Sequence, residues 1–158
     1  MTYPIWLEWL IPLTWTVIFP VNFFMNLLVL VLTMKYLRVS NRKQNVKAVI
    51  LRVWVMEGAA NLIGTTIMLI ITQFDFGRND VWWEKICDGI WNNPWENFGA
   101  FALITMGVVL VAFFIYLFNY KWCLEKADLD DTQRKKVALS LAIVTAPYLF
   151  YLPTEWLY

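Results

Sequence analysis

Residues 98–118 read FGAFALITMGVVLVAFFIYLF, an apolar run in which Thr105 is the only strongly polar side chain. A helix rises about 1.5 Å per residue, so a run of this length spans the ~30 Å hydrocarbon layer of a membrane. Asn119, Tyr120, Lys121 and Trp122 close the run. This pattern is typical of a transmembrane helix.

Three further apolar blocks occupy residues 13–34, 48–72 and 137–153. The first contains no charge and is closed by Lys35, Tyr36 and Arg38. The last is the shortest and contains Pro147, which cannot donate a backbone hydrogen bond. We expect its helix to begin earlier, capped by side-chain oxygens within residues 130–132.

The composition supports the same class, because 60% of the 158 residues are hydrophobic, against roughly 45–50% in soluble domains. The sequence therefore predicts an all-α integral membrane protein, a single domain over residues 1–158 built as a four-transmembrane-helix bundle. Residues 1–12 are expected to form a short interfacial segment. They lack the basic start and small-residue cleavage site of a secretion signal.

Basic residues predict the orientation, because Lys and Arg are enriched in short cytoplasmic loops. Of thirteen basic residues, five lie in the turn 35–47 and five in the turn 119–136, whereas the loop 73–97 has only two. We expect both turns to be cytoplasmic, and the loop 73–97 and both termini to lie outside. The first turn is expected to contact anionic lipid headgroups through Lys35, Arg38, Arg42, Lys43 and Lys47.

Tryptophans gather on the expected outer side, where amphipathic rings settle at the headgroup level. We interpret them as an outer aromatic belt, with a ligand-stacking platform as the alternative. The predicted belt consists of Trp6, Trp9, Trp82, Trp83, Trp91, Trp95 and Trp156.

Several kinds of chemistry have no support in the sequence. The chain has no histidine, which is the commonest metal ligand and general base. Cys87 and Cys123 are expected at opposite membrane faces, too far apart for a disulfide. The acidic run at residues 128–131 is interpreted as a helix start. We therefore expect no catalytic residue, cofactor, metal site or nucleic-acid partner.

Polar residues inside the expected spans are the candidate functional residues, because charge at mid-depth is costly. Glu57 lies about 15 Å into the second span, and Asn61 and Thr65 follow on the same face at four-residue spacing. In an antiparallel hairpin, Asn22 and Asn26 of the first span come level with them.

Arg52 is nearer the cytoplasmic end of the second span than Glu57. Its long side chain can reach the headgroups, and this is the expected arrangement. A charge partner on another helix is the alternative.

Three functions are compatible with this pattern. The leading hypothesis is a non-catalytic accessory or assembly subunit of a larger membrane complex, in which the polar cluster joins helices by hydrogen bonds. The second is a small homo-oligomeric transporter or channel with Glu57 as its proton- or cation-binding group. The third is an enzyme or carrier for a lipid-linked substrate, whose phosphate the basic turns would hold.

Overall fold

A computed structural model describes residue 7, residues 11–73 and residues 81–156, and within these ranges it is helical with no strand. Three long helices dominate it: α1, Trp15–Tyr36; α2, Arg42–Gln73; and α4, Phe98–Phe118. The shorter helices are α3, Val81–Trp91, and α5, Asp131–Val144. A π-helical turn, Asn119–Cys123, and a 3-10 turn, Leu124–Lys126, extend α4. Further 3-10 turns are Pro94–Glu96, Tyr148–Tyr151 and Thr154–Trp156.

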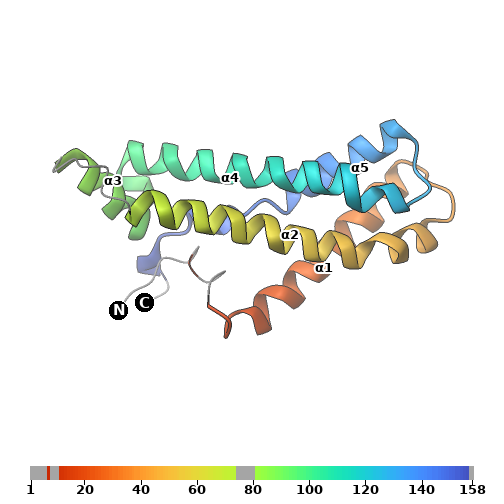
Figure 1. The fold of residues 1–158 in the computed structure, drawn as a ribbon, viewed down its shortest axis with the longest axis horizontal. Coiled ribbons are helices and arrows are strands. Elements are labelled where there is room, and N and C mark those ends of the chain that lie inside the picture. Colours follow the sequence, from red (N-terminus) through yellow and green to blue (C-terminus); the bar gives the residue numbers. More distant parts are fainter. Residues whose placement is uncertain (1–6, 8–10, 74–80, 157–158) are drawn as a thin grey trace.

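The helices form an elongated bundle (Figure 1). Helices α2 and α4 lie side by side and run in opposite directions, α1 crosses α2 obliquely, and α5 packs against α1 and α4. The connections α1–α2 and α4–α5 lie together at one end, here called the turn end. Helix α3 and the turn Thr154–Trp156 lie at the other, here called the α3 end.

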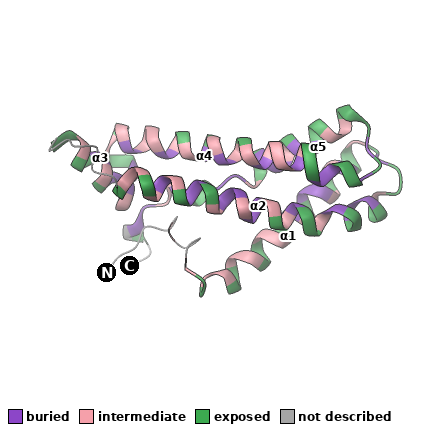
Figure 2. Ribbon diagram, in the orientation of Figure 1, coloured by how far each residue is buried: buried purple, intermediate pink, exposed green. Residues whose placement is uncertain are grey.

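Three helices are long and apolar enough to cross a membrane: Trp15–Tyr36, Arg42–Gln73 and α4 with its extension to Lys126. Their facing sides are buried, whereas their outer sides carry exposed apolar residues such as Val17, Phe24 and Val109 (Figure 2). A soluble protein rarely exposes so much apolar surface. The all-α prediction is confirmed, and these helices indicate a membrane protein.

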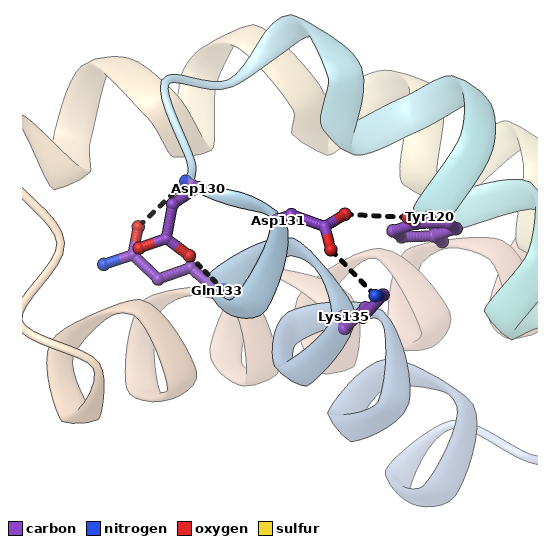
Figure 3. Close-up of polar contacts among 5 residues, drawn as sticks. All are labelled: Tyr120, Asp130, Asp131, Gln133 and Lys135. Atoms are coloured by element: carbon purple, nitrogen blue, oxygen red, sulfur yellow. Dashed lines mark hydrogen bonds and ion pairs between the residues drawn. The ribbon is translucent and has the colours of Figure 1, made fainter.

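The start of α5 is fixed by a capping box (Figure 3). The Gln133 backbone N–H donates to Asp130 Oδ1 at 2.7 Å, and the Asp130 N–H donates to Gln133 Oε1 at 3.2 Å. Asp131 pairs with Lys135 at 2.7 Å and accepts from the Tyr120 hydroxyl at 2.8 Å. These contacts, Lys135 first, lower the pKa of Asp131. The acidic run therefore joins the start of α5 to the end of α4.

Helix α5 ends at Val144, whereas the sequence predicted a span up to residue 153. Pro147 is the physical reason, since it has no N–H to donate to the preceding turn. The chain continues through Thr145 and Ala146 into the 3-10 turn Tyr148–Tyr151. Fourteen helical residues rise only about 21 Å, so the fourth segment is half helix and half irregular backbone.

The irregular half is fastened at the α3 end. The Thr154 N–H donates to the Asn92 carbonyl at 2.8 Å, and its hydroxyl donates to the Trp91 carbonyl at 2.8 Å. The Trp95 indole N–H donates to the Tyr151 carbonyl at 2.8 Å. The fourth segment thus reaches the α3 end of the bundle.

Helices α2 and α4 approach closely at Gly64. A Cβ atom added there would lie 2.1 Å from Cγ2 of Val111, whereas one added at Gly58 would meet nothing nearer than Phe19 at 3.9 Å. Only glycine permits this separation of α2 and α4. The close contact places the α2 face that carries Glu57 against α4.

We expect Gly64→Ala to destabilise the purified protein by roughly 1–3 kcal/mol through overpacking. Gly58→Ala is the matched control and should leave the melting temperature unchanged or slightly higher, because alanine favours a helix. Adding Val111→Ala to Gly64→Ala should recover part of the loss. Equal effects of the two glycine substitutions would contradict the close contact of α2 with α4.

Candidate polar site inside the bundle

Glu57 lies at the centre of the bundle with 0% of its surface exposed. Asn119 Nδ2 donates to Glu57 Oε1 at 3.4 Å, a long hydrogen bond. Thr145 and Asn26 lie near the carboxyl group, but the Thr145 hydroxyl donates to the Leu141 carbonyl at 2.7 Å and no hydrogen bond joins the Asn26 amide to Glu57. The carboxyl group is therefore surrounded by α1, α2, the π-helical extension of α4 and the end of α5.

The sequence did not identify Asn119 or Thr145 as members of this cluster. Asn119 was interpreted as the polar end of the third span, but it begins the π-helical turn and is 0% exposed. A π turn carries one more residue than an α turn and is frequent at functional sites. Thr145 caps α5 just before Pro147. The sequence feature that could have identified Thr145 is its position near Pro147 within an apolar block.

The predicted residues Asn26, Asn61 and Thr65 are buried like Glu57, and Asn26 and Asn61 lie next to it. Asn26 and Thr65 are 0% exposed and Asn61 is 2% exposed. Asn61 Nδ2 donates to the backbone carbonyl of Glu57 at 3.0 Å, a bond within α2. Asn22 is partly buried and borders the cluster on the α1 side.

Many polar atoms of this cluster form no hydrogen bond within the described part of the chain. They are Asn22 Nδ2, Asn26 Nδ2 and Oδ1, Glu57 Oε2, Asn61 Oδ1 and Asn119 Oδ1. A buried polar group without a partner costs about 1–3 kcal/mol. Folded proteins rarely tolerate several such groups together without a functional reason.

A hollow of about 530 Å³ lies beside the cluster, between α1 and the irregular half of the fourth segment. Its walls include Val17, Val21 and Leu149, and Asn22, Asn61 and Thr145 supply polar side chains. A second hollow of about 350 Å³ lies nearer the turn end, lined by residues that include Arg52 and Cys123. The first hollow therefore borders the cluster, through Asn22, Asn61 and Thr145.

The other predicted residues lie away from the cluster. Arg52 is exposed and forms no ion pair with Glu57. The basic residues predicted to contact lipid, in the turn 35–47, lie at the turn end. Four of them are exposed and Arg42 is partly buried. Trp82, Trp95 and Trp156 are exposed, and Trp83 and Trp91 partly buried, in the helices and turns of the α3 end. Trp6 and Trp9 lie outside the described residues. Cys87 and Cys123 are free thiols.

No protein-family model, curated protein or solved structure matches this chain. The geometry of the cluster therefore carries the functional argument.

A comparison of Asn26 with Asn45 measures how much a buried amide side chain contributes to the stability of the fold. Neither amide atom of Asn26 forms a hydrogen bond with any residue that the structure describes. Asn45 joins the two turns instead, because its Nδ2 donates to the Ser40 carbonyl at 3.0 Å and its Oδ1 accepts from the Asp128 N–H at 3.0 Å.

We expect Asn26→Leu to leave the melting temperature unchanged or higher, because leucine removes unpartnered polar atoms and has a similar volume. Asn45→Leu should destabilise the protein by about 1–3 kcal/mol, since it strands the Ser40 carbonyl and the Asp128 N–H. Thermal unfolding of the purified variants gives the comparison. Equal losses would mean that Asn26 holds the helices together.

Proposed function

We propose that this protein is a small membrane transporter that binds a monovalent cation, in exchange with a proton, at Glu57. The observation that carries the proposal is the set of unpartnered polar atoms around a fully buried carboxyl group. Hydrogen-bonding side chains that only join helices would bond one another. The unpartnered atoms of this cluster can instead bind a polar ligand.

The cluster offers the ligand atoms that a cation needs. Within the described residues no donor bonds to Glu57 Oε2, Asn26 Oδ1 or Asn119 Oδ1. The Thr145 side chain lies near the same carboxyl group. Oxygens of this kind suit hard cations. Helix α5 ends beside them, where its final carbonyl groups lack partners within the helix. Broken helices supply cation ligands in the same way in known transporters.

Charge favours a monovalent ion. Glu57 is the one carboxylate of the cluster, and its described partners are neutral. A divalent ion would leave a net positive charge inside an apolar bundle, which is costly. A monovalent ion cancels the carboxylate charge. A proton does the same, so the two compete for one site.

The accessory-subunit hypothesis has weaker support from this geometry. It expects the polar cluster to join helices by hydrogen bonds, but several polar atoms of the cluster form none within the described residues. The lipid-linked-substrate hypothesis placed its phosphate at the basic turns, away from Glu57. Purification in fixed stoichiometry with a different chain would favour the accessory subunit.

The proposed topology has four crossing segments, the fourth being α5 with the irregular residues 145–153. Both turns face the cytoplasm, and α3 and both termini face outward, because the basic residues concentrate at the turn end. Four segments rarely enclose a pathway alone, so we propose a homo-oligomer. Anionic lipids would contact the basic turns.

The cation proposal is tested by the melting temperature of the purified protein in NaCl, KCl and choline chloride at constant ionic strength. A bound ion stabilises by RT ln(1 + [L]/Kd), about 2.7 kcal/mol at a hundredfold excess over Kd. We expect the melting temperature to rise with Na⁺ or K⁺, and to rise less as the pH falls, because protons compete.

Glu57→Gln should fold and keep its oligomeric state but lose the cation dependence, because the amide cannot ionise. Glu125→Gln is the matched control, because Glu125 is exposed outside the cluster, and it should keep the dependence. A wild-type protein whose stability is the same in choline and in both alkali cations would reject the proposal. So would an unchanged cation response in Glu57→Gln.

The orientation is tested with a membrane-impermeant thiol reagent on intact cells. Burial raises the pKa of the Cys87 thiol, so labelling should be done at mildly alkaline pH. Cys123 is only 1% exposed, and the exposed Lys43 provides a better reporter of the turn end. Cys87 should be labelled, whereas a Lys43→Cys, Cys87→Ser variant should be labelled only after lysis. The reverse pattern would overturn the orientation.

A further inference from the structure

The first half of α1 is packed loosely. None of residues 15–25 is buried, whereas the second half of the helix buries Asn26, Val29, Leu30 and Met34. Figure 1 shows the beginning of α1 diverging from α2. This half borders two hollows, one of about 530 Å³ toward the fourth segment and one of about 300 Å³ toward α2. Segments with few buried contacts open at a low cost in free energy.

Pro20 interrupts this half of α1. It has no N–H to donate to the Thr16 carbonyl, and helices bend at such positions. Pro20 is exposed, so its ring fills no position in the core. Residues 15–19 can therefore turn as a unit relative to the second half of α1, which the core holds.

A hydrogen bond fastens residues 15–19 to α2. The Trp54 indole N–H donates to the Phe19 carbonyl at 2.9 Å. The Trp54 ring also meets the rings of Phe19 and Phe23 edge-on, with centroids 5.7 and 5.8 Å apart. Phe19 directly precedes Pro20, so Trp54 holds α1 at the point where it can bend.

The larger hollow ends at the polar cluster. Asn61 lines the hollow and is only 2% exposed, and its amide donates to the backbone carbonyl of Glu57, which is 0% exposed. The cluster is therefore closed to the hollow in this conformation. A cation can reach it from this side only if the hollow widens. Val17 and Ile18, which belong to residues 15–19, form part of its wall.

We propose that residues 15–19 are an outer gate to the Glu57 site, which turns about Pro20 and is held shut by Trp54. The proposal rests on the function proposed above, because a gate serves a site. Opening would separate these residues from the fourth segment and admit water and a cation to the cluster. Hinge movements of a few residues and gating beside a fixed site are known in transporters. Trp54 is a positioning residue, which does not touch the cation.

Access through the gate is measured by cysteine labelling of the full protein in nanodiscs. Ala146 lines the larger hollow and is 8% exposed, so Ala146→Cys in a Cys87→Ser protein reports entry of water. Leu152→Cys, at a partly buried position of the same hollow, is a second reporter. The reagent is a positively charged, membrane-impermeant methanethiosulfonate, and its reaction rate is recorded. The Cys87→Ser protein alone gives the background from Cys123.

Trp54→Phe removes the indole N–H but keeps an aromatic ring. We expect it to raise the labelling rate about two- to tenfold, the range that the net contribution of one hydrogen bond allows. Trp122→Phe, at an exposed tryptophan of the turn end, is the matched control and should leave the rate unchanged. Pro20→Leu supplies an N–H for the Thr16 carbonyl and should slow labelling several-fold, because the helix becomes continuous.

The opposite signs of these effects separate a gate from general loosening, which would raise the rate in both variants. A rate that both variants raise, or that neither changes, would overturn the gate. So would the absence of labelling at both reporters in Trp54→Phe, since lipid or a second copy would then keep water out of the hollow. Labelling is done in choline chloride. The gate is therefore judged separately from cation binding at Glu57, which the melting temperatures test.

Discussion

Burial of the Glu57 carboxyl group is the constraint on which the arrangement of the bundle depends. The helices around it present apolar side chains to the outside, so the carboxyl group can interact only with groups that the chain supplies. Those groups come from three separate segments, with Asn26, Asn119 and Thr145 contributed by α1, the α4 extension and the end of α5. Packing that satisfied apolar burial alone would not need this convergence.

Two departures from regular α-helix occur beside this carboxyl group. The α4 extension becomes π-helical at Asn119, which donates to Glu57. Helix α5 ends at Thr145, whose side chain lies near the same carboxyl group. Irregular backbone is stabilised less well than continuous helix and is concentrated at functional sites. The same layer contains the unpartnered amide atoms. Near Glu57 the helices are therefore irregular and several hydrogen bonds are missing. Natural proteins depart from regular structure in this way at functional sites.

The sequence predicted the parts of the fold that depend on local patterns. The apolar runs at 13–34, 48–72 and 98–118 correspond to α1, α2 and α4, because length and composition determine such helices. The common face of Glu57, Asn61 and Thr65 also followed from helical spacing, and all three are buried.

Asn119 was missed because a π turn changes which residues face inward, and the periodicity of a single helix does not reveal that change. Pro147 ends α5 at Val144. The path of the chain after α5 depends on the contact of Thr154 with Trp91, which is far away in sequence.

The most direct measurement is the infrared difference spectrum of the protein in lipid when choline is exchanged for sodium or potassium. An ionised carboxylate without a counter-charge is costly at this depth, so Glu57 should carry a proton in choline and release it when the cation binds. We expect the band of a protonated carboxyl group to disappear, a carboxylate band to appear, and both changes to be lost in Glu57→Gln. A difference spectrum without carboxyl bands, or one unchanged by Glu57→Gln, would contradict cation binding at Glu57.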